Sequence, residues 1–279
     1  MILSIASGKG GTGKTTIAVN LALSLENNVQ YLDCDVEEPN GHIFIKPQIR
    51  ESKSFAVPIP EVDLQKCTFC GKCTEICEFH AILAIKDNVL VFPELCHSCA
   101  GCWLVCPEGA ISTAERQTGV IETGAADGIE FVHGKLNLGE AMSPPLIREV
   151  KRHKESSKIN IIDAPPGTSC PVIEAIKGSD FVLLVTEPTP FGLHDLKLAV
   201  EMLRLLKLPF GVIINRADIG DESVQDYCDA ESIPVLMRIN NDRKIAEAYS
   251  RGIPIVERYP EFSARFRDLH REIERRIGL

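Results

Sequence analysis

"ASGKGGTGKTT", residues 6–16, is the part of this sequence that best predicts the fold. It satisfies the pattern G-x-x-x-x-G-K-[ST] through Gly8, Gly13, Lys14 and Thr15. The apolar run MILSIA before it predicts a buried strand, and TTIAVNLALSLE after it has the apolar spacing of a helix. A strand, a glycine-rich loop and a helix in this order form a phosphate-binding loop (P-loop), in which backbone N–H groups and the helix N-terminus face the phosphates.

The same stretch predicts which residues hold a nucleotide. The expected phosphate-binding residues are Gly8, Lys9, Gly10, Gly11, Thr12, Gly13, Lys14, Thr15 and Thr16. Lys14 would bridge the β- and γ-phosphates, and Thr15 would ligate Mg²⁺. Lys9 is a second lysine where the pattern needs only one.

The form G-K-G-G-T-G-K-T-T resembles the deviant P-loop ATPases, the group of MinD, ParA, the nitrogenase iron protein and the Mrp-type iron–sulfur carriers. In that family the early lysine crosses a dimer interface and touches the partner's nucleotide. The resemblance implies that Lys9 acts in trans and that ATP holds two identical or paralogous subunits face to face. The alternative is an ordinary loop lysine in contact with solvent.

Two further strand ends complete the expected nucleotide site. QYLDCDVEEPN places Asp33 and Asp35 at the end of a second strand, and KINIIDAPPGT ends its strand at Asp163. The ends of parallel strands face the ligand in an open α/β sheet. By resemblance Asp35 is catalytic, with Lys9 and Lys14, and orients the attacking water. Asp33 and Asp163 hold Mg²⁺ through water, and Gly167 senses the γ-phosphate.

The C-terminal third of the sequence predicts the residues that contact the nucleotide base. PFGVIINRAD ends at Asn215 and Arg216, which resemble the base-reading position of the family. Asn215 can meet the amino group and the ring nitrogen of adenine. Asp218 resembles the guanine-reading Asp of GTPases, although ATP is the usual ligand of the family. NNDRKIAEAYSRG predicts a helix with an Asn cap.

The last segment, EFSARFRDLHREIERRIG, predicts an amphipathic helix. Its apolar face consists of Phe262, Phe266, Leu269, Ile273 and Ile277. A membrane-binding helix favours basic charge, which acidic residues dilute here, so we expect docking on the protein's own core.

Composition restricts location and partners. The chain has 279 residues, of which 44% are hydrophobic and 25% charged, and its net charge is −9. Acidic charge argues against a nucleic-acid partner. No apolar run approaches the length of a membrane span, and the N-terminal run lacks the charged region of a signal peptide. We therefore expect a cytoplasmic protein without stable membrane insertion.

Eleven cysteines need an explanation, because disulfides are unlikely in a reducing compartment. CTFCGKCTEIC and CHSCAGCWLVC both follow C-x₂-C-x₂-C-x₃-C, the pattern of bacterial two-cluster ferredoxins, in which the last cysteine of each run ligates the other cluster. The expected ligands are Cys67, Cys70, Cys73 and Cys106 for one [4Fe–4S] cluster, and Cys96, Cys99, Cys102 and Cys77 for the other. Zinc is the alternative metal. The first run departs from the ferredoxin pattern, with Glu78 where Pro is usual.

The other cysteines and the nearby histidines have simpler interpretations. Cys34 and Cys228 are expected to be small buried hydrophobic residues. Cys170 lies where the nitrogenase iron protein has a ligand of an intersubunit cluster, but no second cysteine accompanies it. His80 and His97 are expected to be loop residues without a metal.

The position of the cysteines predicts an insertion. We expect an α/β fold with a mostly parallel, doubly wound P-loop sheet of the SIMIBI type, formed by residues 1–56 and 125–279. Residues 57–124 would form a small inserted α+β domain of the bacterial ferredoxin type. Pro-rich FAVPIPEVD would mark the entry to the insertion and Gly-rich ETGAADG the exit.

The resemblance covers the whole chain and implies an ATP-dependent iron–sulfur protein. ATP binding and slow, partner- or redox-regulated hydrolysis would gate electron transfer, or metal–sulfur cofactor assembly, on a redox or metal-cofactor protein. The alternative is a positioning ATPase like MinD or ParA that uses its clusters as redox sensors. A plain electron carrier with a dead nucleotide site is disfavoured, because Lys9, Lys14, Thr15, Asp35 and Asp163 are all present.

Overall fold

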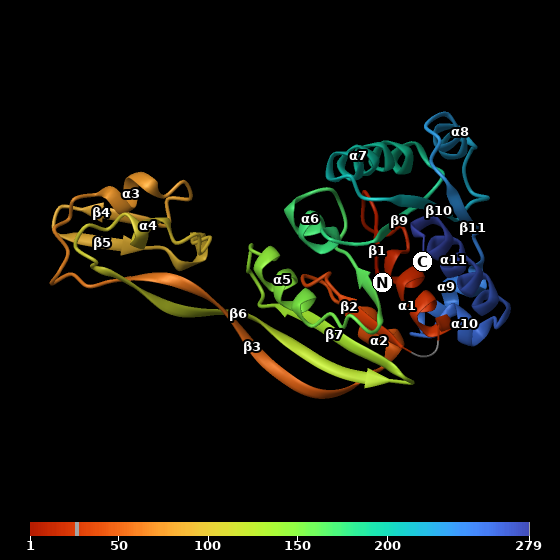
Figure 1. The fold of residues 1–279 in the computed structure, drawn as a ribbon, viewed down its shortest axis with the longest axis horizontal. Helices are drawn as coiled ribbons and strands as arrows, with labels where there is room; N and C mark the ends of the chain where they lie inside the picture. The colour runs from red at the N-terminus through yellow and green to blue at the C-terminus, as the bar shows by residue number, and fades with distance from the viewer. Residues whose placement is uncertain (26–27, 279) are drawn as a thin grey trace.

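The structure, a computed structural model, describes residues 1–25 and 28–278 (Figure 1). Glu26, the last residue of the predicted first helix, and Leu279 lie outside the described residues. The strands are β1 (Ile2–Ala6), β2 (Val29–Asp33), β3 (Gln48–Val62), β4 (Ile82–Ile85), β5 (Asn88–Val91), β6 (Ile111–Ala126), β7 (Ile129–Leu136), β8 (Ile159–Asp163), β9 (Phe181–Thr186), β10 (Phe210–Asn215) and β11 (Val235–Ile239). The helices are α1 (Lys14–Leu25), α2 (Gly41–Ile45), α3 (Lys72–Ile76), the 3₁₀ helix η1 (Pro93–Leu95), α4 (Gly101–Leu104), α5 (Pro144–Arg152), α6 (Cys170–Ile176), α7 (Pro190–Leu206), α8 (Ser223–Ala230), α9 (Arg243–Ser250), α10 (Ile255–Arg258) and α11 (Glu261–Ile277).

Nine of these strands form one sheet in the order β11-β10-β9-β1-β8-β2-β7-β6-β3. The strands from β11 to β7 pair in parallel, whereas β6 and β3 are antiparallel at one edge. The central strands are apolar on both faces, as a sheet covered on both sides requires. The predicted mostly parallel α/β sheet is confirmed.

Helices cover both faces of the sheet and form two hydrophobic cores. One core includes side chains of α5, α6, α7 and α8, and the other includes side chains of α1, α2, α10 and α11. Phe266, Leu269 and Ile273 of α11 are buried, which confirms that the last helix docks on the protein itself. Cys34 and Cys228 are also fully buried, as expected.

The cap of α9 corrects one sequence expectation. The N-cap residue is Asp242, whose side chain accepts a hydrogen bond from the Lys244 amide at 2.7 Å, and not an asparagine. Asp is as good a cap as Asn, so the local pattern could not distinguish the two.

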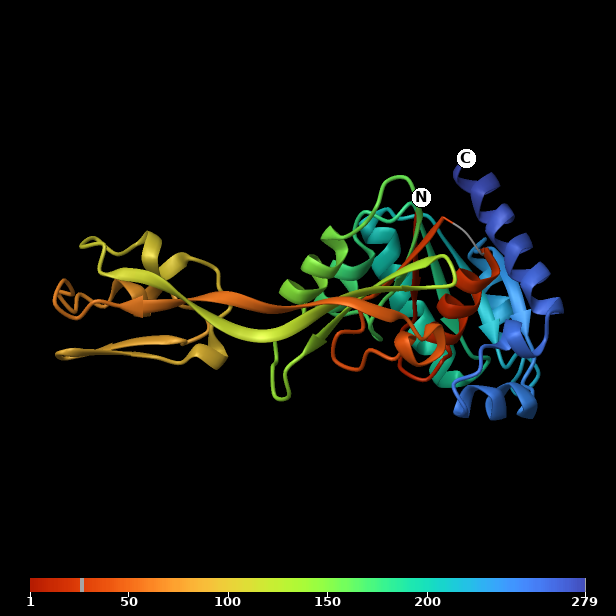
Figure 2. The same ribbon diagram turned by 90° about the horizontal axis from the view of Figure 1, so that it is seen from below.

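The long strands β3 and β6 connect the sheet to a separate lobe. They pair with each other from Gln48–Ala125 to Val62–Ile111, but β6 pairs with β7 only over Gly119–Ala126. The remainder leaves the sheet as a two-stranded ribbon that carries α3, β4, β5 and α4 at its far end (Figure 2). We call residues 63–110 the cysteine lobe.

The predicted boundaries at 56/57 and 124/125 fall inside β3 and β6. The first eight residues of FAVPIPEVD therefore belong to β3, and only Asp63 follows the strand. Its prolines are tolerated because β3 is the edge of the sheet, where a missing N–H need not break a ladder.

Candidate nucleotide site and cysteine cavities

The P-loop leaves β1 in the middle of the sheet and enters α1. Gly11 and Gly13 have φ of 79° and 95°, a region that glycine occupies without strain. Helix α1 begins at Lys14, and the amide of Ile17 donates to the Gly13 carbonyl at 3.0 Å. Lys14 and Thr15 are only 6% and 9% exposed and line a cavity of about 380 Å³.

Neighbouring strands bring the two predicted magnesium carboxylates together. Asp33 and Asp163 are paired positions on β2 and β8, and both side chains are fully buried. Asp33 accepts hydrogen bonds from the amides of Gly41 at 2.9 Å and Asp35 at 3.2 Å. Asp163 accepts one from the Tyr31 hydroxyl at 2.9 Å through Oδ2, whereas its buried Oδ1 has no partner. A buried carboxylate oxygen without a hydrogen bond is costly, so a bound ligand would stabilise it.

The electrostatics of these carboxylates favour a cation. Burial, followed by the charge of Asp163, raises the pKa of Asp33, and the same two causes raise the pKa of Asp35 to about 6. Burial also raises the pKa of Asp163, although interaction with the Thr15 side chain and then the charge of Lys14 oppose that shift. A divalent cation would offset the repulsion, and an all-oxygen donor set suits Mg²⁺. The residues present therefore fit a magnesium site next to Thr15.

Glu187 makes contacts that the sequence did not indicate. This nearly buried carboxylate follows β9, accepts a hydrogen bond from Arg216 Nη1 at 2.7 Å, and lies 3.6 Å from Lys9 Nζ. It therefore joins the P-loop to the loop after β10. Only the single acid in TEPTP could have suggested it, and no spacing rule links that residue to Lys9.

Asn215 lies against the P-loop, and both ends of its side-chain amide are hydrogen-bonded within the protein. Its Nδ2 donates to the Thr12 carbonyl at 2.8 Å, and its Oδ1 accepts from the Arg216 amide at 3.1 Å. Asp218 accepts from the Asn241 amide at 2.5 Å, so its carboxylate is engaged by the protein, unlike a free base-reading carboxylate.

Another wall of the cavity comes from the end of β11 and the segment after it, which sequence reasoning missed. The residues of this wall are Ile239, Asn240, Asn241, Asp242, Ile245, Ala246 and Tyr249. Gly167, the predicted γ-phosphate sensor, has φ of 99° and its amide donates to the Ser7 carbonyl at 3.0 Å.

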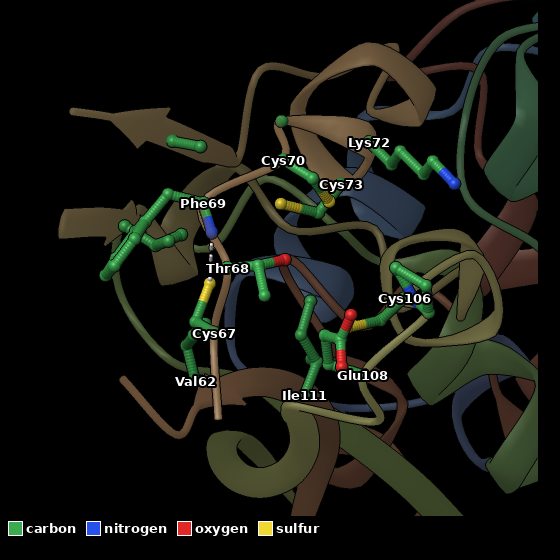
Figure 3. Close-up of a pocket in the computed structure, with 14 residues that line it drawn as sticks. Val62, Cys67, Thr68, Phe69, Cys70, Lys72, Cys73, Cys106, Glu108 and Ile111 are labelled. Atoms are coloured by element: carbon green, nitrogen blue, oxygen red, sulfur yellow. Dashed lines mark hydrogen bonds between the residues drawn. The ribbon is translucent and has the colours of Figure 1, made fainter. Parts of the chain in front are cut away.

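The cysteine lobe contains two cavities, each lined by four cysteines. The first is lined by Cys67, Cys70, Cys73 and Cys106, whose sulfur atoms are arranged around one space in Figure 3. The second is lined by Cys77, Cys96, Cys99 and Cys102. Each cavity thus takes three cysteines from one run and the last cysteine from the other.

The lobe is an internal repeat of 29 residues, since that interval separates Cys67 from Cys96 and Cys77 from Cys106. The amides of Phe69 and Ser98, which both have positive φ, donate to the sulfurs of Cys67 and Cys96 at 3.4 Å. At the other pair, the amides of Ala81 and Ala110 donate to Cys77 and Cys106 at 3.3 Å. Glu78, which replaces the usual proline, leaves this geometry intact.

Cys170 lies outside both sites, whereas His97 lines the second cysteine cavity. Cys170 is exposed at the first residue of α6, and His97 stacks on Phe79 with ring centroids 3.4 Å apart. Within residues 1–25 and 28–278, no three His, Cys, Asp or Glu side chains are grouped as around a single metal ion. No helix in that part of the chain is long and apolar enough to cross a membrane.

The fold and the P-loop site define a nucleotide-binding protein, and sequence comparison identifies the family. Residues 3–255 match the CobQ/CobB/MinD/ParA nucleotide binding domain, so the chain belongs to this family. An uncharacterized protein of Methanocaldococcus jannaschii is 35% identical over 228 residues, which cover 79% of this chain and 80% of that protein. An iron-sulfur cluster carrier protein of Pyrococcus furiosus is 26% identical over 279 residues, 91% of this chain and 78% of that protein.

Comparison of structures supports the same fold. The septum site-determining protein MinD of Pyrococcus horikoshii, solved with Mg-ADP, superimposes with a TM-score of 0.61 at 21% identity, over 99% of this chain and 97% of that chain. The chain therefore shares the fold of MinD.

Proposed function

We propose that this protein is an ATPase that carries two [4Fe–4S] clusters and uses ATP binding and hydrolysis to gate electron transfer, or metal–sulfur cofactor assembly, on a partner protein. The observation that carries the proposal is the pair of four-cysteine cavities on a lobe attached to the nucleotide-binding sheet. The name of the Pyrococcus furiosus relative, an iron-sulfur cluster carrier, supports the assembly form of the proposal.

The arrangement of the cysteines favours cubane clusters over zinc. Zinc sites usually pair cysteines in twos, whereas each cavity here draws three plus one from two repeated runs. Backbone N–H groups donate to two sulfurs of each cavity. Such hydrogen bonds stabilise thiolates and tune the reduction potential of an iron–sulfur cluster. When bound, the clusters would supply one-electron transfer.

The nucleotide chemistry belongs to residues at the ends of the central strands. In the proposed mechanism the P-loop amides and Lys14 hold the phosphates of ATP. Thr15, Asp33 and Asp163 would hold Mg²⁺, the two acids through its water shell. Asp35 lines the same cavity and would orient the attacking water. Its pKa of about 6 leaves it mainly ionised at neutral pH, so it can accept a hydrogen bond from that water.

Lys9 is proposed to act on the nucleotide of a second subunit. Its side chain is 32% exposed, and its Nζ lies 3.6 Å from Glu187. Lys9 can therefore exchange this ion pair for a contact with a second subunit. Lys9→Ala should bind ATP through Lys14 and Thr15 but fail to dimerise. Hydrolysis should fall by at least about hundredfold, the scale for losing one charged group at a transition state. Light scattering and single-turnover hydrolysis with Mg-ATP measure both effects.

Lys53→Ala is the matched control, since Lys53 is a solvent-exposed lysine of β3 paired with Glu51. It should dimerise and hydrolyse ATP like the parent protein. A Lys9→Ala protein with parental turnover and parental association state would return Lys9 to the role of a solvated loop lysine.

The function itself is tested by anaerobic purification with bound partners retained, with and without ATP. We expect a redox protein or a metal–sulfur protein to co-purify in a nucleotide-dependent way and to accept electrons or cluster components from this protein. Co-purification of only a cell-positioning partner, with no transfer in either nucleotide state, would contradict the proposal.

A further inference from the structure

We propose that Leu136 and Asn137, at the end of β7, couple the loop after β2 to the ribbon, so that the bound nucleotide sets the orientation of the cysteine lobe. We call residues 34–40, which include Asp35, switch I. The inference rests on the proposed function in one respect, because it takes switch I to change with the nucleotide.

Two consecutive amides make the connection. The amide of Leu136 donates to the Val36 carbonyl in switch I at 2.9 Å. The next amide, of Asn137, donates to the Thr118 carbonyl of β6, also at 2.9 Å. Successive N–H groups of an extended strand point to opposite sides, so these two reach opposite neighbours. Two adjacent peptide units, joined at Leu136, therefore contact the nucleotide-sensing loop and the ribbon.

The end of β7 is closely packed against its neighbours. A Cβ added to Gly134 would lie 2.9 Å from side-chain atoms of Val36, Leu146 and Val150. A Cβ added to Gly119 would lie 2.6 Å from the Lys135 carbonyl oxygen. Because a close-packed interior has no void to absorb a shift, movement of Val36 must displace the end of β7.

The ribbon bends where it leaves the sheet, and Asn137, directly after β7, contacts this bend. Phe55 pairs with Gly119 and Ala56 with Gln117, so Thr118 is an extra, buried residue. This bulge lies where β6 leaves β7, and bulges bend and twist a strand. Asn137 makes a second hydrogen bond to the bulge, in which its side-chain Nδ2 donates to the Gln117 carbonyl at 3.2 Å.

An ion pair extends the attachment to the free part of the ribbon. Arg116 binds Glu140 with both terminal nitrogens, one at 3.0 Å, and the two side chains are only 15% and 13% exposed. The Glu140 amide donates to the Asn137 carbonyl at 3.1 Å, which closes a turn. Asn137 and Glu140 thus move as one piece with the end of β7.

The ribbon then acts as an arm. From Thr118 to Ile111 it spans seven residue steps, about 23 Å at roughly 3.3 Å per residue. Figure 2 shows the cysteine lobe at the far end of this ribbon. A rotation of about 10° at the base would move the end of the arm by about 4 Å.

The test measures a distance within one chain. Spin labels on non-canonical residues at Asp87, in the β4–β5 turn, and Lys207, after α7, avoid the cysteines. Oxidised, cluster-loaded protein is diluted with unlabelled protein and studied by pulsed EPR with Mg-ADP and with a non-hydrolysable ATP analogue plus Mg²⁺. We expect the mean distance to differ between the two states by about 3 Å or more.

Two variants break the connection without touching the nucleotide site. Asn137→Pro removes the amide donor to Thr118, and Arg116→Gln removes the two-bonded ion pair with Glu140. Each should reduce the nucleotide-dependent shift by at least about twofold, while ATP hydrolysis stays within about twofold of the parent. Arg148→Gln is the control, because it removes the two-bonded Arg148–Glu174 pair, which joins α5 to α6 and does not involve β6 or β7. It should preserve the full shift.

The outcomes separate this inference from the proposed function. Equal distances in both nucleotide states would overturn the coupling, even if ATP still gated electron transfer. A full shift in both Asn137→Pro and Arg116→Gln would also overturn it, because another route would carry the motion. A shift that the variants abolish, without any effect of nucleotide on the clusters, would support the coupling and remove ATP gating.

Discussion

Lys14→Ala is expected to abolish ATP hydrolysis and to leave the iron content of the protein unchanged. Lys14 is buried at the start of α1 and lines the nucleotide cavity, so its loss should lower hydrolysis by at least about hundredfold. The cysteine cavities lie in the lobe at the far end of the ribbon (Figure 1). Iron should therefore stay near about eight atoms per chain, four for each cluster, by elemental analysis of anaerobically purified protein.

The converse variant completes the comparison. Cys67→Ser removes one ligand from the first cavity and should lower iron toward about half, with ATP binding retained. Cys228→Ser, at a buried cysteine outside both cavities, should retain all of the iron. Iron lost in parallel with ATP binding in Lys14→Ala would show that the two modules do not fold and load independently.

Local sequence patterns predicted the parts of the molecule that depend on neighbours in the chain. The P-loop could be predicted because glycines, Lys14 and Thr15 must follow a strand and open a helix at fixed spacing. The grouping of the cysteines was predicted from the three-plus-one pattern, and the cavities of the lobe contain those sets. The amphipathic pattern of α11 was sufficient to place its apolar face on the core.

Contacts between distant segments could not be predicted in the same way. Pro-rich FAVPIPEVD indicated the entry to the insertion but not the continuation of β3, because only the order of strands shows that β3 is an edge where prolines are tolerated. Tyr31 looks like any buried strand residue, yet its hydroxyl binds Asp163 across 132 positions of sequence. Glu187 meets Lys9 only because β9 lies next to β1 in the sheet. Each of these depends on strand order, which no local spacing encodes.

The redox properties of the proposed clusters are expected to differ between the ATP and ADP states. ATP can shift the lobe only through its different affinity for the two conformations, and a few kcal/mol of difference is sufficient to invert a two-state population. Switch I contacts β7, and β7 contacts the ribbon, so the geometry offers a route for that energy. We therefore expect the nucleotide to change the reduction potential or the rate of electron transfer to a partner.

Thermodynamic reciprocity makes this expectation stringent. If exchanging ADP for ATP alters the affinity of the clusters for an electron, reduction must alter the relative affinity for the two nucleotides by the same factor. For one electron, a tenfold factor corresponds to a potential shift of about 59 mV. An EPR-monitored redox titration measures the shift under Mg-ADP and under Mg-ATP, with Asp35→Asn used to slow hydrolysis. Nucleotide affinities of the oxidised and reduced protein then give the factor independently.

The same experiment decides between the two functions that the sequence suggested. A gated electron-transfer or assembly protein requires the ATP and ADP states to differ in reduction potential or in the rate of transfer to the co-purifying acceptor. Lys14→Ala should show neither difference. A positioning ATPase with clusters as redox sensors requires only that reduction change nucleotide affinity or hydrolysis, and by reciprocity a change in affinity also appears as a shift in potential. The transfer rate therefore separates them, because only the gated protein delivers electrons faster in one nucleotide state. Identical potentials and identical transfer rates would contradict ATP-gated electron delivery, and the sensor function would then require reduction to change the rate of hydrolysis without changing nucleotide affinity.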